Sequence, residues 1–142
     1  MQVLKVLPEA KVRIPMAEEF EEYMRVVKKR HPYIGERRCV LAMDGLKIGI
    51  QKSPHYIIQE FFYNGYTCNH YVTNMLVFTP ASTIIVCGIN IPRSVRDSEV
   101  ANVCSVYEKL RKIFEDFGIF MFVDSVFCLK SGNHLIKSGK CN

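Results

Sequence analysis

Several features that would identify a protein class directly are missing from this sequence. Its six cysteines are scattered without a C-x-x-C pair, which argues against a zinc site or a disulfide framework and favours a reducing, intracellular compartment. No apolar run reaches the length of a membrane span, and the apolar opening Met1–Leu7 lacks the layout of a signal peptide, so we expect no membrane partner. The glycines are isolated, so there is no glycine-rich loop that would cradle a nucleotide phosphate.

Acidic side chains are missing from the end of the sequence. Residues 125–142 contain neither aspartate nor glutamate, although the chain has 14 acidic residues in all. A site that requires a further carboxylate from beyond Asp124 therefore finds no donor within these residues.

What is present is the composition of one globular domain. The chain has 142 residues, of which 49% are hydrophobic and 23% charged, a balance that supports a single hydrophobic core rather than disorder. The formal net charge of +5 is compatible with a phosphate-backbone partner, although many proteins without such a partner are equally basic.

The first half of the chain predicts a helix followed by a hairpin. Apolar residues at helical spacing and a proline at the first turn predict a helix over Pro15–His31. Residues Arg37–Met43 read as a strand, Asp44-Gly45 as a tight turn, and Leu46–Gln51 as a second short strand, because Asp-Gly between extended runs is a strong hairpin pattern. An irregular piece from Pro54 follows.

The second half predicts a sheet covered by one helix. Strands are expected at His70–Thr79 and at Thr83–Ile91, the latter as a central strand because it is a nearly continuous run of β-branched residues. One helix should run from the Ser94–Asp97 region to Gly118. The remaining expected strands are Ile119–Val123, buried on both faces, and a short one at His134–Ile136.

Two of these apolar runs end on an aspartate. Asp44 follows Val40–Met43, and Asp124 follows Ile119–Val123. Open α/β sheets place ligand sites at the carboxyl ends of their strands, and paired carboxylates there are typical of Mg²⁺ or Mn²⁺ sites for phosphoryl transfer. On spacing alone, turn and cap roles for the two aspartates are favoured instead.

Four motifs, in order, resemble a known family. They are Ala42-Met43-Asp44-Gly45; Phe62-Tyr63-Asn64-Gly65-Tyr66 with His70-Tyr71-Val72; Cys87-Gly88-Ile89-Asn90-Ile91-Pro92 leading to Asp97-Ser98; and Val123-Asp124-Ser125-Val126-Phe127. Together they resemble the DDE endonuclease domain of Harbinger-type transposases, over about residues 20–136.

The resemblance implies a ribonuclease H-like α/β fold, a mixed sheet with flanking helices whose first strand lies parallel to the strand after the first long helix. It also implies an acid triad that binds divalent metal, in which Asp44 matches the first aspartate and Asp124 the second. The third residue, a glutamate on a later helix, has no match here. Asp97 resembles a further family aspartate, with Arg96 where histidine is common, and for Asp97 helix capping is favoured over metal ligation.

We therefore expect an N-terminal arm and helix at residues 1–34 and a partial endonuclease domain at residues 35–142, truncated before the final helix. The leading hypothesis is a transposase-derived nuclease that uses Mg²⁺ or Mn²⁺ on DNA and is inactive alone for lack of the third acid, which leaves open whether the chain is an enzyme. The alternative is a catalytically dead remnant that binds DNA or protein. Further candidate partners are a second copy of the chain or an accessory DNA-binding protein. We expect an intracellular protein, which would act in the nucleus if the source is eukaryotic. A third reading is an unrelated α/β domain with Asp44 merely in a hairpin.

Overall fold

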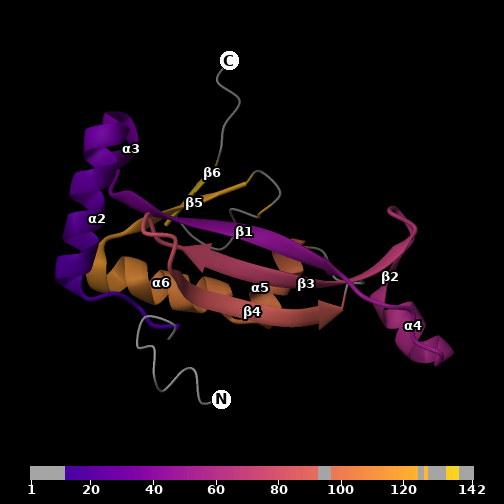
Figure 1. Cartoon of the computed structure of the whole chain (residues 1–142). Coiled ribbons are helices and arrows are strands. Elements are labelled where there is room, and N and C mark those ends of the chain that lie inside the picture. The colour runs from indigo at the N-terminus through magenta and orange to yellow at the C-terminus, as the bar shows by residue number, and fades with distance from the viewer. Residues whose placement is uncertain (1–11, 93–96, 125–126, 128–133, 138–142) are drawn as a thin grey trace, which may run out of the picture.

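The computed structural model of the chain describes residues 12–92, 97–124, 127 and 134–137 (Figure 1). In chain order these residues form α2 (Ala17–Arg30), α3 (Pro32–Glu36), β1 (Cys39–Gly49), α4 (Tyr56–Phe62), β2 (Tyr63–Asn64), β3 (Asn69–Phe78), β4 (Ile84–Pro92), α5 (Asp97–Val103), α6 (Val106–Phe117), β5 (Phe120–Val123) and β6 (Leu135–Lys137). No helix in these ranges is long and apolar enough to cross a membrane.

The strands form one mixed sheet with β1 at its centre. The order is β2–β3–β1–β5–β6, and β4 also pairs with β3. β3 runs antiparallel to β1 and β4, whereas β5 is parallel to both β1 and β6. The first long strand and the strand after the long helix are therefore neighbours and parallel, as predicted, and the α/β architecture is compatible with a ribonuclease H-like fold.

The predicted hairpin at Asp44-Gly45 is wrong. β1 runs without a turn through both residues, and it pairs with β3 from Ala42 to Gly49. A tight turn at Asp44-Gly45 would pair only the few residues on either side of the turn. β3 instead pairs with eight consecutive residues of β1. The reading in which Asp44 is merely a hairpin residue therefore fails.

Two further expectations about the strands are also wrong. β4 is not central, because within the described residues it pairs only with β3. β5 is not buried on both faces, because Phe122 is 39% exposed while its neighbours Met121 and Val123 are buried. The β-branched run of β4 thus reflects strand propensity and one-sided burial rather than a central place in the sheet.

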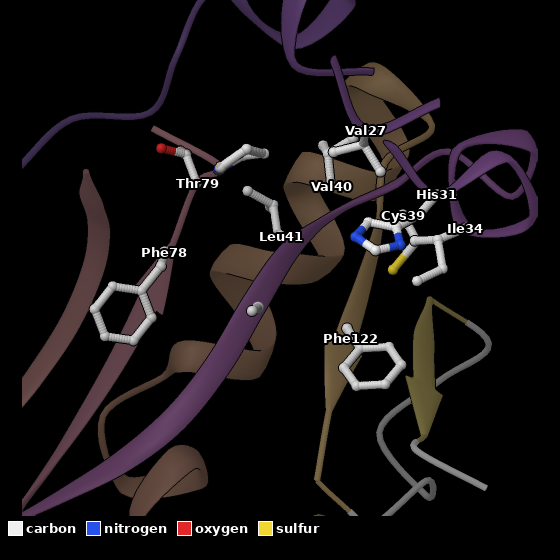
Figure 2. Close-up of a pocket in the computed structure, with 11 residues that line it drawn as sticks. Val27, His31, Ile34, Cys39, Val40, Leu41, Phe78, Thr79 and Phe122 are labelled. Atoms are coloured by element: carbon white, nitrogen blue, oxygen red, sulfur yellow. The ribbon is translucent and has the colours of Figure 1, made fainter. Parts of the chain in front are cut away.

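The sheet has one open face. Along β1 the side chains that alternate with the buried Leu41 and Met43 are exposed, from Ala42 through Asp44 to Ile48. At the amino-terminal end of β1, an apolar groove of about 250 Å³ lies where this face meets the end of α2 and α3 (Figure 2). Ala42, Phe78 and Phe122 line it from the sheet.

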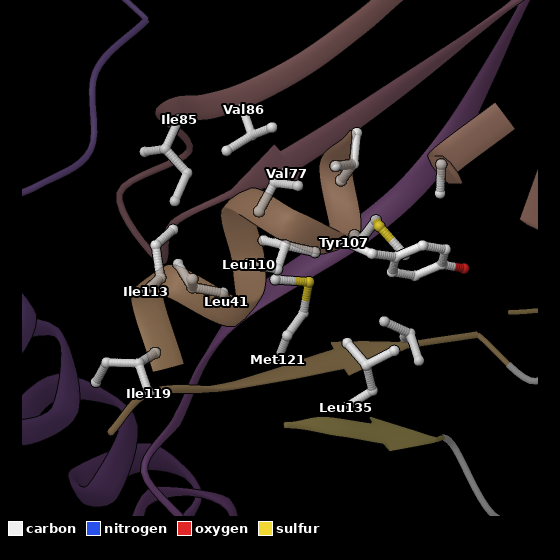
Figure 3. Packing of buried hydrophobic residues seen from close by; sticks show 14 of the residues in the cluster. Leu41, Val77, Ile85, Val86, Tyr107, Leu110, Ile113, Ile119, Met121 and Leu135 are labelled. Atoms are coloured by element: carbon white, nitrogen blue, oxygen red, sulfur yellow. The ribbon is translucent and has the colours of Figure 1, made fainter. Parts of the chain in front are cut away.

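The opposite face packs against helices and forms the core (Figure 3). α5 contacts β3 and β4, and α6 contacts β4. Leu110 and Ile113 of α6 are almost fully buried with Leu41, Val77 and Met121 of the strands. α2 joins the same core at one end, since the Phe20 ring lies 5.0 Å from that of Phe117.

The predicted single long helix is in fact two. α5 ends at Val103 and α6 starts at Val106, because Ser105 takes a left-handed conformation with φ of 49°. The break brings Cys104 against Gly88 of β4, so closely that a Cβ on Gly88 would lie 2.3 Å from the Cys104 Sγ. The predicted stop at Gly118 is confirmed, with φ of 65° at the cap.

The helices before and after β1 differ in how well they were predicted. α2 occupies the expected span, but Pro32 begins α3 rather than loop. α4 was not predicted: it has only seven residues, and none of them is buried. In Figure 1, α4 and β2 lie at the end of the molecule opposite α2 and α3.

Candidate functional site

The two predicted aspartates lie side by side. β1 and β5 are parallel and in register at Met43 and Val123, so Asp44 and Asp124 occupy the next positions on neighbouring strands. Adjacent strands are about 4.8 Å apart, and residues at matching positions face the same side. Because Met43 and Val123 point into the core, the two aspartates point to the open face, where both are exposed.

The backbones that carry the two aspartates differ. Asp44 lies in the middle of β1, opposite Leu76 of β3, whereas Asp124 is the first residue after β5. The Asp44 Oδ1 accepts a hydrogen bond of 2.7 Å from the Gly45 N–H, which fixes the carboxylate locally. The predicted adjacency of the strands is confirmed, while roles for Asp44 and Asp124 in catalysis or metal binding stay predictions.

One buried polar residue supports β1 beyond the aspartate. Asn74 of β3 is 5% exposed and lies on the same face as Asp44. Its Nδ2 donates to the Leu46 carbonyl at 3.4 Å, and its Oδ1 accepts from the Asn90 N–H at 2.9 Å, so it joins three strands. The sequence analysis missed Asn74, although a polar residue within a strand of mostly apolar residues was the feature that could have revealed it.

A third acidic ligand is not found near this pair in the described residues. No group of three or more His, Cys, Asp or Glu side chains there is placed to hold a metal ion. Glu99, Glu108 and Glu115 are exposed on helices that cover the opposite face. Asp97 is the first residue of α5, and its side chain lies outside the described part, so capping and ligation there stay predictions.

The apolar groove offers no chemistry of its own. It is lined by Cys39 and His31 among otherwise apolar or hydroxyl side chains, with no carboxylate. Burial raises the pKa of the Cys39 thiol to about 11, so this cysteine stays protonated at neutral pH and is a poor nucleophile. The groove therefore adds no acid or reactive nucleophile to Asp44 and Asp124.

A comparison with known families decides whether the chain is an unrelated α/β domain. Residues 43–140, more than half of the chain, match the family described as DDE superfamily endonuclease. The chain belongs to this family. The match of this DDE endonuclease chain starts one residue before Asp44 and includes Asp124, so the resemblance seen in the motifs is confirmed. No curated protein and no solved structure matches it significantly.

Proposed function

We propose that this DDE endonuclease domain derives from a transposase and that Asp44 and Asp124 hold a divalent cation, Mg²⁺ or Mn²⁺, against a DNA phosphate. The observation that carries the proposal is the parallel register, which sets two carboxylates beside each other on an exposed sheet face. The family supports DNA as the substrate class. If the source is eukaryotic, we propose that the protein acts in the nucleus.

The donor set fits a hard cation. Carboxylate oxygens are the ligands that Mg²⁺ and Mn²⁺ prefer, and strand positions hold them rigidly. When bound, such an ion would stabilise charge on the phosphate and lower the pKa of a coordinated water. The role of Asp44 is to fix the site, because its Oδ1 is held by the Gly45 N–H and its strand by β3. Asp124 completes the pair from β5.

We further propose that these 142 residues alone bind the ion weakly and do not cleave DNA. Two carboxylates leave most of an octahedral shell to water. A two-metal mechanism needs a further anionic ligand to anchor the second ion and to fix the in-line geometry. Residues 125–142 provide no carboxylate side chain, and the exposed glutamates of α5 and α6 lie on the wrong face of the sheet.

The lack of a third carboxylate beside Asp44 and Asp124 in the described residues also favours the second candidate function, a domain that binds DNA or protein without cutting. The net charge of +5 is compatible with a phosphate-backbone contact that needs no metal. The two candidates differ in one respect: cutting requires Asp44, whereas binding through basic side chains does not.

Calorimetric titration with Mn²⁺ tests the metal site. The wild-type chain should bind Mn²⁺ weakly, and Asp44→Asn should abolish the heat of binding because one anionic ligand is lost. Asp116→Asn is the matched control, because Asp116 is also an exposed aspartate but lies on α6, outside the proposed site. Equal binding by wild type and Asp44→Asn would refute the site.

Incubation of the purified chain with supercoiled plasmid and Mn²⁺ tests activity. We expect no nicking above that of Asp44→Ala, which controls for contaminating nuclease. Gel-shift binding of the same DNA in EDTA, retained in Asp44→Ala, would support the binding function. Nicking by the wild type that disappears in Asp44→Ala would refute the proposed inactivity and would mean that a third ligand comes from this chain or a second one.

A further inference from the structure

The largest unexplained feature of the surface is a concentration of exposed apolar side chains at one end. Of the large hydrophobic residues that are exposed in the described part of the chain, half lie in residues 46–66, which we call the arm. The arm contains the end of β1, α4 and β2, and it projects from the body opposite α2 and α3 (Figure 1). Tyr56 and Ile57 are each 71% exposed, and Tyr66 is 95% exposed.

Within the described residues, the helix of the arm is not covered by the rest of the chain. None of the residues of α4 is buried, and its main contacts are with β3. A helix of seven residues is far shorter than the roughly 12–15 residues that are marginally stable alone in water, so α4 depends on packing. Its Ile57 and Phe61, one turn apart, lie on the same side of the helix and are both exposed.

We propose that the arm is the interface of a symmetric dimer, in which α4 of one copy packs against α4 of a second copy. The exposed apolar residues of the arm present roughly 900 Å² of surface, if a whole residue of this size exposes about 200 Å². A stable interface of standard size buries about 800 Å² on each partner. Summed over its sides, the exposed apolar surface of the arm is therefore similar in size to one side of a standard interface.

The composition of the arm fits a second copy better than a nucleic acid. Interface centres are rich in aromatic residues and poor in charge, whereas a DNA surface needs clustered lysine and arginine. The charged residues of the arm are Lys47, Lys52 and Glu60 only, so opposite signs are available and little like-charge repulsion opposes a two-fold contact. The proposal does not depend on the proposed nuclease function.

Sedimentation of the full chain over a range of micromolar concentrations tests the dimer. The wild type should have twice the mass of the 16.4 kDa chain, in reversible equilibrium with it. Ile57→Asp should weaken dimerisation by about 30-fold or more, because it sets a charge at the centre of an apolar contact. Ile57→Leu keeps the apolar contact and should remain dimeric.

Val103→Asp is the matched control. Val103 is a β-branched residue on α5, 68% exposed, and lies outside the arm. It should leave the dimer intact, and far-UV circular dichroism should show that every variant is folded. A wild type that stays monomeric, a larger assembly without a discrete dimer, an Ile57→Asp protein that dimerises like the wild type, or equal dissociation by Val103→Asp would each overturn the proposal.

Discussion

The close contact between Gly88 and Cys104 predicts that Gly88→Ala lowers the free energy of unfolding, whereas the same substitution without this contact would raise it. A Cβ added at Gly88 would lie 2.3 Å from the Cys104 Sγ and 2.6 Å from its Cβ, while the next neighbour, Met75 Cβ, is at an ordinary 3.9 Å. Rotation of the Cys104 side chain moves the sulfur but not the Cβ. In Gly88→Ala, β4 must therefore move away from the junction of α5 and α6 by about 1 Å, since carbon atoms approach to about 3.5–4 Å.

The expected cost follows from overpacking. Extra methyl groups in a well-packed core destabilise by about 1–3 kcal/mol. For a chain of this length about 3–5 °C of melting temperature corresponds to each kcal/mol, so Gly88→Ala should melt about 3–15 °C lower. Without the clash the same substitution would stabilise by about 0.4–1 kcal/mol, because alanine restricts the unfolded chain more than glycine.

A double-mutant cycle isolates the contact. Cys104→Gly removes both obstructing atoms, so in that background Gly88→Ala should cost little or should stabilise, which gives a coupling of about 1 kcal/mol or more. Cys104→Ala keeps the Cβ and should rescue only in part. Urea unfolding followed by circular dichroism measures all the variants. An equal cost of Gly88→Ala in the wild-type and Cys104→Gly backgrounds would show that this contact does not hold the helix junction on β4.

Two further predictions concern titratable side chains. At pH 8, iodoacetamide should alkylate the exposed Cys68 in the native protein but should reach Cys39 only after unfolding, because burial raises the pKa of the Cys39 thiol to about 11. Peptide mass spectrometry reports both sites. Labelling of Cys39 in the native protein would contradict its burial. Burial, helped by the charge of Arg111, lowers the pKa of His134 from the usual 6.5. As the pH falls, the unfolded chain therefore binds a proton at His134 before the folded chain does. The free energy of unfolding should therefore fall as the pH drops below about 6.5. His134→Gln should lose this part of the pH dependence in urea unfolding at pH 7 and pH 5.5, and an unchanged slope would refute it.

The elements with strong periodicity were predictable from the sequence. The α2 span and the Gly118 stop followed from helical spacing and cap chemistry, and β3 followed from a run of strand-forming residues. α4 was harder to predict, because its seven residues are too few to establish a helical period and none of its apolar residues is buried. The break at Ser105 brings Cys104 against Gly88, a contact between distant segments that no local sequence pattern contains.

The site was predictable in composition but not in its backbone setting. An apolar run that ends on an aspartate located both Asp44 and Asp124, and their adjacency follows from the parallel pairing of β1 with β5. The local Asp-Gly pattern predicted a turn at Asp44, whereas pairing with Leu76 and its neighbours on β3 keeps the strand extended. Tertiary pairing overrode the local preference there.

The two aspartates have unequal backbone settings. Asp44 lies within a strand that has β3 on one side and β5 up to Met43 on the other, so its position follows the core of the sheet. Asp124 lies one residue beyond the last paired position of β5, and its carbonyl accepts a hydrogen bond from the Phe127 N–H at 3.1 Å. In the proposed ion site, the sheet would therefore position one ligand and the chain that leaves β5 would position the other. The spacing of the two carboxylates, and with it the preference between Mg²⁺, with oxygen distances of about 2.0–2.1 Å, and the wider Ca²⁺, with about 2.3–2.6 Å, would be set where β5 ends.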